Sequence, residues 1–225
     1  MKTLSRRQLL VASFIGLTTS AIGGVSACGQ VKRGPCPLTP PQTEGPFYPV
    51  EDQIDENNDL TFVSGHAGKA EGTVIYVIGQ VQDDYCRPVE QVRVEIWQAS
   101  AKGRYRHPGD RNNPVPLDQN FQGWGESMTD PEGRYLFKTI HPGQYPAGPG
   151  WVRPSHIHFK VLGKGVRELT TQMYFEGDQY LEQDRIFLAV PSAQQQHVIV
   201  TSETPGSDFP PDALVYRFNL VVQRI

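Results

Sequence analysis

The sequence predicts an all-β protein, an antiparallel β-sandwich with long ordered loops. No segment of the 225 residues repeats its apolar positions with the period of a long helix. Apolar residues fall instead in short alternating or continuous runs that end at Gly, Pro, Asn or Asp. The 22 Gly and 19 Pro are scattered without a repeat, which indicates many turns rather than low complexity. Short strands separated by turn signals are typical of a sandwich or a barrel.

Eight segments have the residue pattern of strands. In "VRVEIW" the alternation places two valines and an isoleucine on one face, and Arg93, Glu95 and Trp97 on the other. In "TDPEGRYLF", Pro131 and Gly133 supply the chemistry of a turn that leads into a strand. The expected strands are Thr73–Gln82, Gln91–Ala99, Arg134–Thr139, His156–Leu162, Leu169–Phe175, Ile186–Val190, Gln196–Ser202 and Leu214–Gln223.

Two long stretches, Cys36–Gly72 and Lys102–Ser127, lack the strand pattern. Loops of this length in a compact domain are usually functional or disordered. Both contain aromatic side chains of the kind that is usually buried, so we expect ordered loops lying on the sandwich; these aromatics are Phe47, Tyr48, Tyr105, Phe121 and Trp124. We therefore divide the chain into residues 1–28, an extended N-terminal segment at 29–72 and a β-sandwich at 73–225.

The first 28 residues have the pattern of an export signal. Arg6 and Arg7 precede an apolar run from Leu9 to Ala27, and Cys28 follows small residues. The twin arginines predict that the protein is exported after it has folded. Proteins that use this route often acquire their cofactor before export. The ending "VSAC" resembles a bacterial lipoprotein cleavage box, so we expect Cys28 to carry lipid and anchor the protein in the periplasm or elsewhere outside the cytoplasm. An uncleaved N-terminal membrane anchor is the alternative.

Cysteine count and charge narrow the class of the remaining chain. Cys36 and Cys86 are left after Cys28, and in an oxidising compartment we expect them to form a disulfide. Two free buried thiols are the alternative.

The net charge is −3 and no dense basic block follows the N-terminus, so a nucleic-acid partner has little support. The chain after the signal is long enough for one domain with a sizeable core.

The stretch "RPSHIHFKV" raises the question of a metal site. His156 and His158 stand at i and i+2 of an expected strand, so both imidazoles lie on one face at a spacing that lets them reach one metal. A His-x-His pair alone is more often structural than metal-binding. Pro154 prevents a helix from running into the strand, and Arg153 stands just before it.

Few donors are available to complete such a site. No nearby carboxylate gives the two-histidine, one-carboxylate set of ferrous iron, and no nearby cysteine gives a zinc or blue-copper thiolate. The hard anionic donors left in the loops are tyrosine phenols, and Tyr105 in "GRYRH" and Tyr145 in "GQYP" lie upstream. A ferric ion is acidic enough to bind phenolate at neutral pH. A zinc or copper site on the histidine pair alone is the alternative.

The chain resembles the intradiol ring-cleavage dioxygenases of the protocatechuate 3,4-dioxygenase type. The resemblance extends from Thr39 to Asp178, in the family's order and near its spacing. It implies a β-sandwich that binds one non-haem Fe(III) per chain. The matching segments are "TPPQTEGPFYP", "VEIWQASAKGRYRHPGD", "PLDQNFQGWGESMTDPEGRYLFKTIHPGQYP", "RPSHIHFKV" and "TQMYFEGD".

The resemblance also implies roles for single residues. The family's iron ligands fall on two tyrosines and two histidines: Tyr105, Tyr145, His156 and His158. Tyr145 is also expected to leave the metal and act in catalysis, together with Arg153, which stabilises charge on the substrate, and Gln172, near the oxygen site. The alternatives without a role in the site are a surface ion pair for Arg153 and an ordinary polar strand position for Gln172.

The substrate pocket is implied by the same resemblance. A Gly-Pro turn that lines it falls on Gly45 and Pro46, within the N-terminal segment and on the same chain as the ligands. Two departures concern "PAGPGWV": the loop from Tyr145 to the histidines is shorter than in the family, and Ala147 replaces a tryptophan that packs on the substrate. We expect Ala147 and Trp151 to contact the substrate and to help decide which catechol fits.

The resemblance implies an oxidoreductase that cleaves a catecholic ring with O2 to a cis,cis-muconate-type diacid. Candidate substrates are protocatechuate, catechol, hydroxyquinol and lignin-derived catechols. The partners are then a small catechol and O2, with a homodimer allowed and membrane contact only through the N-terminus. The alternative is an exported β-sandwich binding module with a degenerate or non-iron metal site.

Overall fold

The computed structural model describes residues 35–51 and 55–225, as twelve strands and four short helical segments. The expected signal segment and Cys28 lie outside the described residues. Within the described ranges, no helix has the length and apolar character needed to cross a bilayer. The strands are β1 (Val74–Asp83), β2 (Arg93–Trp97), β3 (Trp124–Met128), β4 (Arg134–Ile140), β5 (Tyr145–Gly148), β6 (Trp151–Arg153), β7 (His156–Leu162), β8 (Leu169–Phe175), β9 (Ile199–Val200), β10 (Ser202–Glu203), β11 (Leu214–Arg217) and β12 (Leu220–Val222). The helical segments are η1 (Pro108–Asp110), η2 (Leu181–Gln183), α1 (Arg185–Leu188) and α2 (Ser192–Gln195).

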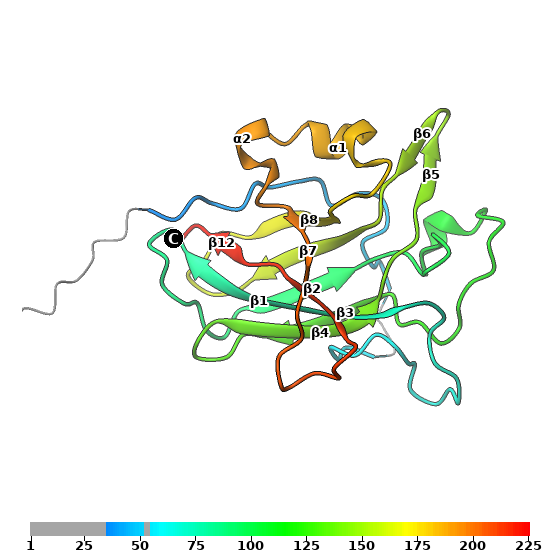
Figure 1. Ribbon diagram of the computed structural model, residues 1–225, viewed down its shortest axis with the longest axis horizontal. Helices are drawn as coiled ribbons and strands as arrows, with labels where there is room; N and C mark the ends of the chain where they lie inside the picture. The colour runs from blue at the N-terminus through cyan, green and yellow to red at the C-terminus, as the bar shows by residue number, and fades with distance from the viewer. Residues whose placement is uncertain (1–34, 52–54) are drawn as a thin grey trace, which may run out of the picture. The chain divides into compact units, whose positions relative to one another are not determined.

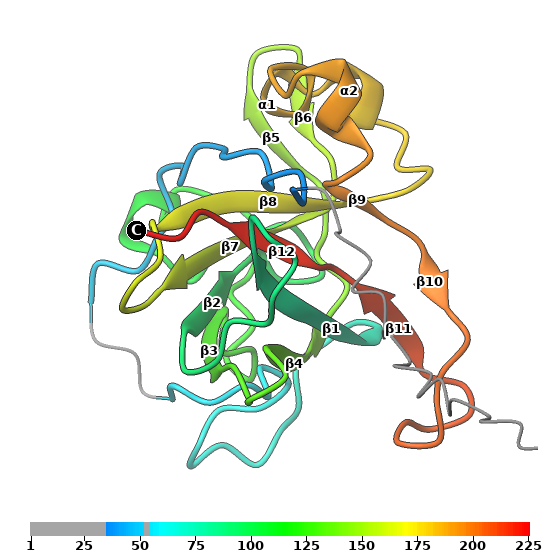
Figure 2. The same ribbon diagram turned by 90° about the vertical axis from the view of Figure 1, so that its left-hand side faces the viewer.

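Two five-stranded sheets and a hairpin make up the fold (Figure 1). The first sheet has the order β10-β11-β1-β12, with β4 also paired to β1, and the second has the order β3-β2-β7-β8-β9. The hairpin β5–β6 and the helices α1 and α2 lie together at the top of both views (Figure 2). Apolar side chains from both sheets form one core, among them Val77, Phe137, Ile157 and Phe159, all fully buried. The predicted sandwich is confirmed.

The sheets are mixed, which corrects the expectation of purely antiparallel strands. β11 and β12 both run parallel to β1, and β9 runs parallel to β8. The expected strand Leu214–Gln223 is interrupted between β11 and β12, where Phe218 passes close to β1. A Cβ at Gly79 would lie 2.0 Å from the Phe218 carbonyl oxygen, so only glycine fits at this crossing.

Several segments differ in type from the expectation, among them the loop from Tyr145 to the histidines, which contains the hairpin β5–β6. The segment Ile186–Val190 is not a strand but lies largely in α1, because the Asp184 carboxylate caps the Phe187 amide at 3.0 Å. Phe187 and Val190, three residues apart, are its buried members, which is a helical spacing. β3 lies in a stretch expected to be loop; its sequence "WGESM" has a weak strand pattern, and its pairing with β2 defines it.

The alternation in β2 and β7 sets the position of everything described below. Val94 and Ile96 of β2 face the core as expected, together with Ile157 and Phe159 of β7. The residues between them therefore face outward, away from the first sheet. On β7 these outward residues include both histidines, so the candidate site lies on the outer face of the second sheet.

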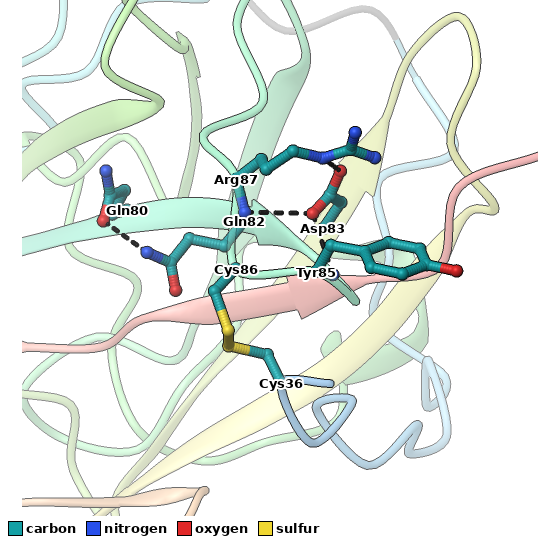
Figure 3. Close-up of a disulfide and its surroundings, with 7 residues drawn as sticks. All are labelled: Cys36, Gln80, Gln82, Asp83, Tyr85, Cys86 and Arg87. Atoms are coloured by element: carbon teal, nitrogen blue, oxygen red, sulfur yellow. Dashed lines mark hydrogen bonds and ion pairs between the residues drawn. A yellow bond between two sulfur atoms is a disulfide. The ribbon is translucent and has the colours of Figure 1, made fainter. Parts of the chain in front are cut away.

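A disulfide joins Cys36 and Cys86, with 5.4 Å between their Cα atoms (Figure 3). Cys86 belongs to the turn after β1, where its φ is +61° and its amide donates to the Asp83 carbonyl at 2.8 Å. Burial tends to raise the pKa of Asp83, but hydrogen bonds from Arg87 and Tyr85 outweigh it and lower that pKa. The predicted bridge is confirmed, and it fixes the start of the N-terminal segment to an ordered turn.

Replacing both bridge cysteines by serine should lower the free energy of unfolding by about 2–4 kcal/mol, because the bridge closes a loop between residues that are 50 apart in the sequence. Urea denaturation measures this. A Cys28→Ser variant keeps the bridge and is the matched control. When denatured without reductant, this control should contain no reactive thiol, and two reactive thiols would contradict the bridge.

Candidate metal centre

Four aromatic side chains converge on the outer face of the second sheet. His156 and His158 come from β7, Tyr145 begins β5, and Tyr105 lies in the loop that follows β2. The Tyr105 Oη and His156 Nε2 atoms are 3.3 Å apart. Ring centroids lie 5.4 Å apart for the two tyrosines and 4.9 Å apart for the two histidines. All four side chains are buried, so the predicted ligand residues are brought together.

Each histidine ring is fixed by a different contact. His156 Nδ1 lies 2.7 Å from the Pro154 carbonyl oxygen, so that Nδ1 donates and Nε2, which faces Tyr105, keeps its lone pair. The His158 ring stacks on Trp97, with 4.7 Å between centroids and 11° between planes. His158 Nδ1 is buried and has no hydrogen-bond partner among the described residues. A histidine that only packs in the core usually has its ring nitrogens hydrogen-bonded. A buried imidazole with an unused nitrogen is therefore more typical of a residue that binds another group.

The tyrosines are fixed by the loops. The Tyr105 amide donates to Asp110 Oδ2 at 2.8 Å, and its ring stacks on Phe47 with centroids 4.4 Å apart. Tyr145 pairs with Arg153 in the β5–β6 register, which places the phenol and the guanidinium on neighbouring strands. Both tyrosines therefore depend on segments that cover the sheet rather than on the sheet itself.

The protonation states of the histidines suit metal binding. Burial lowers the pKa of both His156 and His158 well below the usual value, and the Arg153 charge adds to the effect. The imidazoles are therefore neutral, which is the form that binds metals. Burial raises the pKa of Tyr105 and Tyr145. A bound cation would reverse this and favour phenolate. No cluster of three His, Cys, Asp or Glu that could hold a metal occurs in ranges 35–51 and 55–225, so the phenols complete the donor set. These residues fit a ferric ion.

A pocket of about 240 Å³ lies beside the cluster, with Tyr145 and His158 in its wall. All the residues expected to contact the substrate line it: Gly45, Pro46, Ala147 and Trp151. Tyr145, Arg153 and His158 also line it, whereas Tyr105, His156 and Gln172 do not. The sequence reasoning missed four further residues of the wall, Phe47, Asp110, Pro146 and Ile186, because wall position depends on how the loops fold over the sheet.

Arg153 is held by a buried carboxylate that the sequence reasoning missed. The Arg153 Nε donates to Asp184 Oδ1 at 2.9 Å, and both side chains are almost fully buried. Asp184 also accepts from Trp151 Nε1 at 3.0 Å and caps α1. The alternative of a surface ion pair for Arg153 is therefore wrong, because its partner is buried beside the pocket. The sequence signal for Asp184 was an N-cap residue before "RIFL".

Gln172 lies behind Arg153 rather than in the pocket wall. Its Oε1 accepts from Arg153 Nη2 at 2.6 Å, and its Nε2 donates to the Thr43 carbonyl at 3.0 Å. The side chain is fully buried. These contacts make Gln172 a residue that positions Arg153 and the N-terminal segment. Its expected place near the oxygen site stays a prediction.

Side-chain contacts hold the N-terminal segment on both sides of the turn at Gly45 and Pro46; we call these contacts clamps. Glu44 pairs with Lys160 at 2.8 Å, and the Tyr48 hydroxyl donates to buried Glu95 at 2.7 Å. Burial and the Glu95 hydrogen bond raise the pKa of Tyr48 to about 12. Between these clamps, Gly45 has a φ of +72°, and a Cβ there would lie 3.5 Å from His158 Cε1. The turn is thus held against His158.

Comparisons with known proteins agree with this geometry. Residues 43–224 match a family model described as Dioxygenase. The chain is 42% identical over 203 residues to the protocatechuate 3,4-dioxygenase beta chain of Burkholderia cepacia, covering 86% of this chain and 85% of that one. It is 30% identical over 187 residues to catechol 1,2-dioxygenase 2 of Acinetobacter lwoffii, covering 74% of this chain and 63% of that one. The solved dioxygenase domain of a carbohydrate-binding fusion protein from Streptomyces sp. SirexAA-E superposes with a TM-score of 0.62 at 26% identity, over 84% of this chain and all of that one.

Removing the charge of Asp184 should destabilise the fold, because it leaves the Arg153 guanidinium buried without a counterion. We expect Asp184→Asn to lower the free energy of unfolding by about 3 kcal/mol or more. Glu203→Gln breaks the exposed pair with Arg217 at 3.0 Å and should cost at most about 1 kcal/mol. Urea denaturation of both variants checks the difference, and equal losses would contradict a buried ion pair.

Proposed function

The chain belongs to the intradiol dioxygenase family, and from that premise we propose that it binds one non-haem Fe(III) and cleaves a catecholic ring with O2 to a cis,cis-muconate-type diacid. One observation carries the proposal. Two buried tyrosines and two buried histidines converge beside a pocket of about 240 Å³. For comparison, a cavity of about 150 Å³ lined by apolar side chains binds benzene. The pocket is therefore of the size that a single aromatic ring requires.

The ligand set follows from the donors. Tyr105, Tyr145, His156 and His158 would hold the ferric ion, with two phenolates offsetting most of its charge. Bound Fe(III) supplies Lewis acidity and accepts electron density from a catecholate, which exposes the ring to O2. The stacking of His158 on Trp97 and the carbonyl contact of His156 keep both imidazoles in the orientation that this binding requires.

The pocket residues have separate tasks. Tyr145 lines the pocket, so that its phenolate is placed to take a proton from an incoming catechol hydroxyl. The Arg153 guanidinium lies in the same wall, where it stabilises negative charge on the substrate oxygens. Asp184 and Gln172 keep that guanidinium in place. Pro46 and Phe47 cover the ring and exclude water.

We further propose that the protein acts outside the cytoplasm. The support is the twin-arginine pattern at Arg6 and Arg7, the lipoprotein-type Cys28, and a disulfide of the kind that persists in oxidising compartments. A homodimer is compatible with the family and stays a prediction.

Removing a ligand phenol should remove iron. Tyr105→Phe should lower the iron content of the purified protein at least tenfold, because the phenylalanine side chain has no atom that can bind the metal. Tyr174→Phe is the matched control: this buried tyrosine contacts Gln42 and Gln172 and lies outside the ligand set. Metal analysis measures iron per chain. Equal iron in the two variants would remove Tyr105 from the site.

Oxygen uptake tests the reaction itself. The iron-loaded protein should consume one O2 for each catechol, and mass spectrometry with labelled O2 should find both atoms in the diacid. Tyr145→Phe should retain iron better than Tyr105→Phe but turn over more slowly, because the substrate loses its proton acceptor. Unchanged turnover in Tyr145→Phe would contradict that role, and no uptake with any catechol would contradict the function.

A further inference from the structure

A second depression has one lining residue in common with the ring pocket. It has a volume of about 580 Å³ and lies between the N-terminal segment and the α1–α2 region. Figure 1 shows this segment, in blue, running beneath the two helices. We call this depression the outer groove. Its lining comes from residues 40–43 of the N-terminal segment and from the α1–α2 region, which contributes Arg185, Ile186 and Ala189 among others.

The outer groove and the ring pocket share one lining residue, Ile186. That residue lines both spaces, and its neighbour Arg185 lines only the groove. The ring pocket, at about 240 Å³, is larger than the cavity of about 150 Å³ that binds benzene, so a bound ring leaves space for a few further atoms. A longer substituent would extend past the wall of the ring pocket, where Ile186 is the residue that the pocket shares with the groove.

The groove lining offers apolar contacts and one charge. Most of its members are proline, alanine, valine and isoleucine, and Arg185 is the one charged residue among them. The Arg185 side chain is exposed, and within ranges 35–51 and 55–225 it makes no hydrogen bond or ion pair. Its guanidinium lies 5.1 Å from the centroid of Trp151, which lines the ring pocket. An arginine over an aromatic wall is suited to bind a carboxylate.

Arg153, the cation in the wall of the ring pocket, already has a counterion, unlike Arg185. Arg153 is already matched by Asp184 and hydrogen-bonded to Gln172. A carboxylate attached directly to the ring would also share the pocket with Asp110, another wall residue. A carboxylate at the end of a short apolar chain would instead meet the unmatched charge of Arg185.

We propose that the preferred substrates are catechols whose ring carries a short apolar chain ending in a carboxylate, with the chain in the outer groove and the carboxylate on Arg185. This inference rests on the proposed function and names its substrate class. Dihydrocaffeate, a catechol with a propanoate chain, has this chemistry. Propylcatechol has the chain without the charge, protocatechuate has the charge without the chain, and catechol has neither.

Oxygen-uptake kinetics of the iron-loaded protein on these four compounds test the proposal. The kcat/KM should be highest for dihydrocaffeate. Arg185→Gln should lower the ratio of kcat/KM for dihydrocaffeate over propylcatechol about fivefold, the size expected for an exposed ion pair. Arg167→Gln, at an exposed arginine that lines neither space, is the matched control and should leave the ratio unchanged.

A second variant tests the groove itself. Ala189 lines only the outer groove, so Ala189→Trp should obstruct it and lower kcat/KM for both chain-bearing compounds relative to catechol. Turnover of catechol without a preference for dihydrocaffeate, or an unchanged ratio in Arg185→Gln, overturns the substrate class and leaves the proposed function intact. Absence of oxygen uptake with all four compounds overturns the proposed function and the substrate class together.

Discussion

The two-residue alternation of β7 is the constraint on which the site depends. Ile157 and Phe159 enter the core between the sheets, and this fixes His156 and His158 on the opposite face. A shift of one residue in the register with β2 or β8 would place imidazoles in the core and apolar side chains in the site. The apolar core therefore specifies the orientation of the histidines. The same β2–β7 register sets Trp97 opposite His158, where its ring supports the imidazole.

The tyrosines and the pocket require a second layer on that outer face. Three groups of contacts assemble it: the disulfide at the start of the N-terminal segment, the clamps at Glu44 and Tyr48, and the buried Arg153–Asp184 pair. The last joins β6 to α1, which also carries Ile186 and Arg185. The residues that bind a metal and those that shape the substrate space are thus connected through one buried ion pair.

Local pattern was enough to predict the sandwich, β7 and β8, and it placed both histidines on one face. The disulfide was also predictable, because only two cysteines remained after the signal. That Tyr105 and Tyr145 lie beside the two histidines was predicted from the family resemblance, because local sequence patterns do not determine how loops fold over a sheet. Asp184 was missed because an N-cap aspartate gives no sign of a buried arginine partner 31 residues away. The segment Ile186–Val190 was wrongly expected to be a strand because a short apolar run has no period long enough to separate strand from helix. The parallel β1–β11 and β1–β12 pairings depend on the path of the whole C-terminal chain.

The central claim is that two tyrosinates of this chain bind ferric iron. Resonance Raman spectroscopy of the iron-loaded protein, with excitation in its visible absorption band, tests this most directly. We expect a reddish-brown protein whose spectrum contains enhanced tyrosinate ring vibrations that shift when a catechol binds. A protein that stays colourless after ferric reconstitution, or that binds iron without tyrosinate vibrations, would contradict the account.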